Sequence, residues 1–171
     1  MFDKMLLRGR GLMCKNTRVN LMKKGNNKRY RFSGTFEKYG FKYTDRYRTH
    51  AAGTVLLIDI KDEDGIVVTD HLWFNLTKGF RSLGILSPGD VVSFNGRVKP
   101  YQKGYLGHRF GKTQSCTTDY KIDRPTKVTL ERTNDKATRE KFSTKNWTLC
   151  NQIYEMYKED YQKRGIPKPY V

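Results

Sequence analysis

The segment that decides the fold is residues 54–101, TVLLIDIKDEDGIVVTDHLWFNLTKGFRSLGILSPGDVVSFNGRVKPY. It contains three runs rich in β-branched and apolar residues, 54–60, 66–76 and 91–99, and the last two alternate apolar with polar positions. A period of two is typical of β-strands with one buried face. The Asp-Glu-Asp-Gly sequence at 62–65 is a turn signal. The segment therefore predicts three strands.

Two more strands are predicted outside this segment. Residues 29–43 form a long run whose aromatic residues move from even to odd positions. Such a change of face requires a β-bulge or kink, and we expect Gly34 or Gly40 to supply it. Residues 120–130 predict the last strand, with a possible interruption at Pro125.

Two helices are predicted beside the strands. Residues 78–86 carry apolar side chains at helical spacing and predict a short helix that plugs one end of the sheet. A longer helix is predicted over 143–164, ended by Gly165. Its aromatic stripe consists of Trp147, Tyr154, Tyr157 and Tyr161. We expect this stripe to pack on the sheet, and the alternative is that it binds a partner protein.

The composition fits one small domain with appendages. The chain has 171 residues and 36% apolar residues, enough for one modest core. We predict a basic, flexible arm over 1–28, a β domain over 29–132, and a connector with the C-terminal helix over 133–171.

The charge favours a polyanionic partner. The formal net charge is +17, and the first 48 residues hold 14 Lys and Arg against three acids. Such a surface attracts nucleic acid or an anionic membrane. Basic, aromatic and glycine residues without any acid then follow one another over 97–112, a mixture that suits phosphates and unstacked bases. The candidates there are Arg97, Lys99, Tyr101, Lys103, Tyr105, Arg109, Phe110 and Lys112.

Five strand regions with a short helix between the third and fourth resemble the oligonucleotide/oligosaccharide-binding (OB) fold. The residues that carry the resemblance are 32–41, 54–60, 67–76, 78–86 and the sequence SPGDVVSFNGRV at 87–98. The resemblance implies a mainly β protein: a five-stranded OB-type barrel with a plug helix, to which this chain adds a C-terminal helix.

The resemblance also implies a binding surface on strands 2 and 3 and on two loops. On strand 3 the resemblance points to Thr69, His71 and Trp73, and in the loop after strand 1 to Tyr43, Arg46 and Arg48. In the loop between strands 4 and 5 it points to Tyr101, Lys103, Tyr105, Arg109 and Phe110. Trp73 has two interpretations, because a large aromatic on a polar face is either covered by the chain or available for stacking.

These observations predict a protein that binds single-stranded nucleic acid with little sequence specificity. We expect the strand to be DNA, and RNA stays an alternative, because a contact to a 2′-hydroxyl has no sequence signal. The alternative is an accessory subunit that docks on a polymerase, primase or helicase of a phage or mobile-element replication module. That hypothesis depends on the aromatic C-terminal helix.

An enzyme is not expected, and neither is a cofactor or a metal. The acids cluster at 62–64 without a partner for acid–base chemistry, and His50, His71 and His108 lack metal-ligand spacing. The three cysteines are scattered, which fits a reducing cytoplasm. No apolar run is long enough for a signal peptide or a membrane span, so we expect a cytoplasmic protein.

Overall fold

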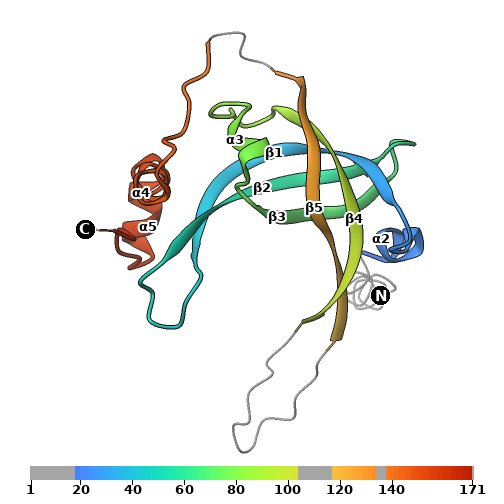
Figure 1. The fold of residues 1–171 in the computed structure, drawn as a ribbon, viewed down its shortest axis with the longest axis horizontal. Coiled ribbons are helices and arrows are strands. Elements are labelled where there is room, and N and C mark those ends of the chain that lie inside the picture. The colour runs from blue at the N-terminus through green and yellow to red at the C-terminus, as the bar shows by residue number, and fades with distance from the viewer. Residues whose placement is uncertain (1–17, 104–116, 134–137, 171) are drawn as a thin grey trace, which may run out of the picture.

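The structure is a computed structural model that describes residues 18–103, 117–133 and 138–170 (Figure 1). It is mainly β, as predicted, with one antiparallel five-stranded sheet in the order β3-β2-β1-β4-β5. The strands are β1 (Arg29–Tyr43), β2 (Ala51–Asp62), β3 (Val67–Asn75), β4 (Val91–Lys103) and β5 (Thr117–Arg132). The helices are α2 (Val19–Lys24), α3 (Lys78–Arg81), α4 (Asn146–Met156) and α5 (Lys158–Lys163).

The sheet is strongly coiled but open. Strand β1 pairs with β4 and β2, whereas no pairing joins β3 to β5 in the described part of the chain. The predicted closure into a barrel is therefore not confirmed. Within the open sheet, Gly34 lies so close to β2 that an added Cβ would be 2.8 Å from Ile60 Cδ1. This close approach allows β1 to coil between its two neighbours.

The predicted change of face in β1 occurs, but not at a glycine. From Phe36 to Lys38 strand β1 advances by two residues while β2 advances by one, from Leu57 to Leu56, so the bulge falls at Glu37. A second register shift, between Ser33 and Thr35, spans Gly34, so this predicted glycine does lie at an irregularity of β1, whereas the pairing through Gly40 is regular. The change of face itself falls at Glu37, because a β-bulge does not require glycine in every case. After the bulge, Tyr39 points into the core.

The core lies on the concave face of the sheet, and α3 closes one end of it. Phe80 of α3 is buried with its ring centroid 5.8 Å from that of Phe74 on β3 and 6.2 Å from that of Phe94 on β4. These rings join three elements that are distant in the sequence. The helix falls within the predicted segment 78–86 and is shorter than that segment.

The predicted C-terminal helix is two helices, because the chain leaves helical geometry at Tyr157 (φ −124°, ψ 30°). Helix α4 packs on β1 and β2, where Leu149 lies against Gly53, and a Cβ added to that glycine would be 2.7 Å from Leu149 Cδ2. The apolar face of α4 therefore covers this protein's own sheet.

The described part of the predicted basic arm, residues 18–28, contains α2 beside the opening between β3 and β5 (Figure 1). Leu21 of α2 is fully buried in the core. Asn20 donates a side-chain hydrogen bond to the Val67 carbonyl of β3, at 3.1 Å. Arg18, which precedes α2, reaches both sides of the opening. This short segment thus fills the space that strand pairing leaves open.

Candidate functional site

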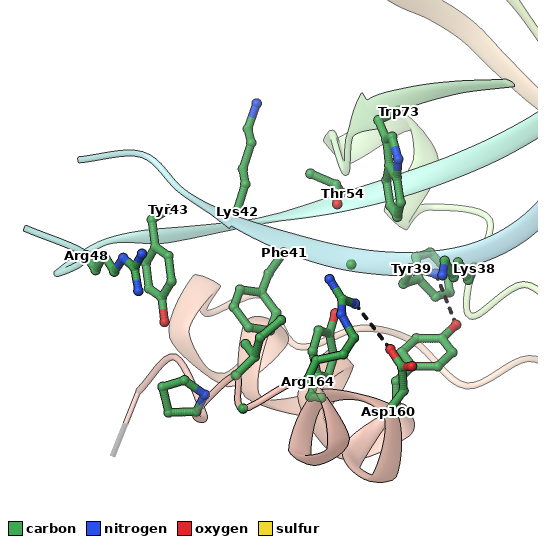
Figure 2. A pocket seen from close by; sticks show the side chains of 16 residues that line it. Lys38, Tyr39, Phe41, Lys42, Tyr43, Arg48, Thr54, Trp73, Asp160 and Arg164 are labelled. Atoms are coloured by element: carbon green, nitrogen blue, oxygen red, sulfur yellow. Dashed lines mark hydrogen bonds and ion pairs between the residues drawn. The ribbon is translucent and has the colours of Figure 1, made fainter. Parts of the chain in front are cut away.

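A groove of about 560 Å³ follows an unpaired edge of β1 (Figure 2). The pairing of β1 with β4 ends at Thr35, so among the described strands residues 38–43 have only β2 as a neighbour. Helix α5 and the residues after it lie opposite this edge. We call this space the α5 groove. Its cationic and aromatic lining residues are Lys38, Lys42, Arg48, Arg164, Tyr39, Phe41, Tyr43, Trp73, Tyr157 and Tyr161.

Trp73 forms one side of the α5 groove. Its backbone pairs with Leu56 of β2, and its ring reaches over β2 to Gly40 of β1, where an added Cβ would be 3.1 Å from the ring. The residue is nevertheless 49% exposed. Trp73 is therefore supported by the sheet beneath it and still has a large accessible aromatic surface, which is what base stacking requires.

Tyrosines of the C-terminal region fix the opposite side. The Tyr39 backbone N–H donates a hydrogen bond to the Tyr157 hydroxyl at 3.0 Å. The Tyr161 ring stacks on Tyr154, with centroids 5.3 Å apart and planes 9° apart, and lies 5.1 Å from the ring of Phe41. Burial raises the pKa of both the Tyr157 and Tyr161 hydroxyls, so each stays protonated at neutral pH.

The lining of the α5 groove is cationic. Lys38, Lys42 and Arg48 are exposed, and Arg164 joins them from the far side. Of the described residues, Asp160 is the one acid that lines the groove, and its carboxylate is 3.2 Å from the Arg164 guanidinium. Four cations and one acid give this groove a positive potential, which attracts phosphate groups.

The loop 44–50 is held in shape by Asp45. Its carboxylate accepts hydrogen bonds from the Thr49 hydroxyl and backbone N–H and from the His50 backbone N–H, at 2.6, 3.0 and 2.8 Å. These bonds lower the pKa of Asp45 to about 2. The loop presents Tyr47, which is 85% exposed. Our sequence reasoning missed Tyr47, and its position between Arg46 and Arg48 was the available signal.

The structure brings together only some of the predicted binding residues. Tyr43, Arg48 and Trp73 line the α5 groove, whereas Thr69 is buried and offers no ligand contact. His71 is exposed on β3 with its ring 3.1 Å from Asp70. The other predicted residues lie elsewhere: Arg46, Arg97, Lys99 and Lys103 are exposed, Tyr101 is half-buried, and Tyr105, Arg109, Phe110 and Lys112 lie outside the described residues.

The predicted partner stripe is also divided. Tyr154 and Tyr161 are buried, and Tyr157 lines the α5 groove. Trp147 is 53% exposed on α4, away from the groove. The candidate site also contains three cations that the sequence did not single out, Lys38, Lys42 and Arg164. Arg164 is far from the two lysines in the chain and becomes their neighbour only through folding.

The described residues contain no group of three or more His, Cys, Asp or Glu side chains placed to hold a metal ion. Cys150 is buried, and burial raises the pKa of its thiol to about 11. Cys14, Cys116 and His108 lie outside the described residues. Within the described part of the chain, each helix is too short or too polar to cross a membrane.

The chain has no significant match among protein-family models, curated proteins or solved structures. The function of this protein therefore has to be inferred from the geometry and chemistry of its own residues.

Proposed function

We propose that the protein binds single-stranded nucleic acid with little sequence specificity, on the outer face of β1–β3 and in the adjoining α5 groove. The observation that carries the proposal is Trp73, a half-exposed tryptophan supported by Gly40 and flanked by Lys38 and Lys42. Cations bind the phosphates, and a flat ring stacks on an unpaired base whatever its identity.

The architecture supports the same proposal. The strand order, with α3 between β3 and β4, suits an OB-type fold, in which a partly open five-stranded sheet binds oligonucleotides through strands 2 and 3 and the adjacent loops. Trp73 lies on β3, and the 44–50 loop joins β1 to β2. The proposed surface thus combines the two kinds of element that such folds use.

Docking on a replication enzyme through the C-terminal helix has less support. Of the four aromatic residues in the predicted stripe, only Trp147 is exposed and away from the α5 groove. The others pack within this protein or line the groove. We therefore take nucleic-acid binding as the function that the geometry supports best.

The test is fluorescence anisotropy with labelled oligo-dT, the matching RNA and a duplex, each at three salt concentrations. We expect a preference for the single strands and an affinity that falls steeply with salt. Trp73→Ala should weaken binding by about 1–3 kcal/mol, the range for one stacked base.

The matched control is Trp147→Ala, because both tryptophans are about half exposed and only Trp73 lines the α5 groove. This control should bind like the wild type. Equal, weak binding to all three probes, unchanged by Trp73→Ala, would contradict the proposal. The ratio of the DNA and RNA affinities decides between the two kinds of strand.

A further inference from the structure

We propose that α5 is part of the nucleic-acid site, and that the α5 groove accepts a single nucleotide with its base against Trp73 and its phosphate at Arg164. This inference rests on the proposed function and assigns to the C-terminal region a role in binding the nucleic acid itself.

The α5 groove has walls on two sides and the edge of β1 between them. Figure 2 shows Trp73 on one side of β1 and Arg164 with Asp160 on the other. The volume of about 560 Å³ lies within the range of roughly 300–1,000 Å³ found for small-molecule sites. The groove therefore suits one nucleotide of a strand.

Glycine at position 40 contributes to this shape. A Cβ there would lie 3.1 Å from both the Trp73 ring and the Thr54 hydroxyl, so the absence of a side chain lets the ring rest on β1. The ring is thereby held in one place next to the groove. A supported aromatic surface binds a base with less loss of conformational freedom than a mobile one.

Arg164 is available to a phosphate. Among the described residues, the polar partner of its guanidinium is Asp160, one helical turn away, and both side chains are more than half exposed. An exposed ion pair of this kind contributes little to stability. Arg164 can therefore exchange the Asp160 carboxylate for a phosphate at a small cost in free energy. The planar guanidinium can then donate two parallel hydrogen bonds to phosphate oxygens.

The charge balance favours a nucleotide over a peptide. The α5 groove presents Lys38, Lys42 and Arg48 in addition to Arg164, against the single acid Asp160. A ligand that matches this lining is both anionic and aromatic. A nucleotide combines the two properties in one unit, with the phosphate and the base on opposite ends.

The experiment compares Arg164→Gln with Lys163→Gln, using labelled oligo-dT over a range of salt concentrations. Both substitutions remove one positive charge at the C-terminal end of α5, but Lys163 does not line the α5 groove. Arg164→Gln should weaken binding on the order of tenfold, as for loss of a hydrogen bond to a charged group. The slope of log K against log salt should also decrease by about 0.7, as for one lost phosphate of a single strand.

A second readout follows the base directly. The chain has two tryptophans, so in a Trp147→Phe background Trp73 is the single tryptophan reporter. Thymidine 5′-monophosphate should quench its fluorescence, and deoxyribose 5-phosphate, which lacks the base, should not. The quenching should be lost with Arg164→Gln and kept with Lys163→Gln.

The outcomes separate the two proposals. If Trp73→Ala weakens oligonucleotide binding while Arg164→Gln behaves like Lys163→Gln, the protein binds single strands but α5 does not contribute, and this inference is overturned. If Trp73→Ala also has no effect, the proposed function fails with it. Unchanged thermal unfolding of Arg164→Gln would show that the lost binding is not a loss of folding.

Discussion

The two unpaired margins of the sheet are covered in different ways. Between β3 and β5, α2 fills the opening with the buried Leu21, and Arg18 is only 14% exposed in its side chain. Along β1, α5 leaves a groove in which Trp73 and Arg164 remain accessible. One margin is completed as part of the core, whereas the other keeps a groove that is open to solvent.

The comparison is clearest for the two arginines. Arg18 donates hydrogen bonds to the Asp119 carboxylate at 2.9 Å, to the Tyr101 hydroxyl at 3.0 Å and to the Tyr120 carbonyl at 3.0 Å. It also reaches the His71 carbonyl of β3 at 3.4 Å. Arg18 therefore links β3 to β4 and β5, and its largely buried guanidinium is held by partners within the fold. A basic residue in the sequence is thus not by itself a binding residue.

The largest expected effect is on stability at the α2 margin. Arg18→Gln leaves the mostly buried Asp119 carboxylate without its closest cationic partner, so we expect a loss of about 3 kcal/mol in the free energy of unfolding. Arg164→Gln should change that free energy by less than about 0.5 kcal/mol. Urea unfolding of both variants measures the difference, and equal effects would refute the contrast between the two margins.

A smaller effect is expected at the floor of the α5 groove. Gly40→Val adds a Cβ within 3.1 Å of the Trp73 ring and must displace it, at a cost of about 1–2 kcal/mol in stability. The affinity for oligo-dT should fall as well, because the Trp73 ring loses its support. Gly65→Ala is the control, since no atom lies within 4 Å of its added Cβ although its positive φ makes the substitution strained. Its oligo-dT affinity should equal that of the wild type.

The smallest effect is a pH dependence at the α2 margin. Burial of Asp62 is the largest single influence on its pKa and opposes ionisation. The hydrogen bond from Lys24 at 2.8 Å and those from the Ile66 and Asp64 backbone N–H groups together outweigh it and hold the pKa of Asp62 below its usual value. A lowered folded-state pKa stabilises the protein above the unfolded pKa of about 3.9, and this contribution is lost as the pH falls through the folded value.

Lys24→Gln should accordingly lower the melting temperature at pH 6, and the difference from the wild type should shrink below pH 4. Lys163→Gln serves as the control with the same change of charge, because the Lys163 side chain forms no ion pair with any acid of the described residues. A difference for Lys24→Gln that is independent of pH would show that the Lys24–Asp62 pair does not stabilise α2.

Some elements were predictable because their signal is local. The expected strand 29–43 coincides with β1, and the other four expected strands each overlap an observed one. Alternation of apolar residues reports burial of one face directly. Helix α2 was missed because its sequence is short and basic, and a single buried residue, Leu21, attaches it to the core.

The candidate site was harder to predict because its parts are distant in the sequence. Trp73 was recognised from its place on the polar face of a strand. The α5 groove, however, combines β1 with residues after position 156, and the break at Tyr157 that positions α5 has no clear sequence signal. Thr69 was wrongly placed on the accessible face, since alternation alone does not show what covers a strand.

The sequence by itself determined the mainly β class, the approximate strands and the strong positive charge, because composition and periodicity are properties of neighbouring residues. Only the tertiary structure decided that Arg18 is bound within the fold while Arg164 is accessible, and that Trp73 rests on Gly40. Burial and partnership depend on contacts between residues far apart in the chain, and these exist only once the sheet has coiled and the helices have packed against it.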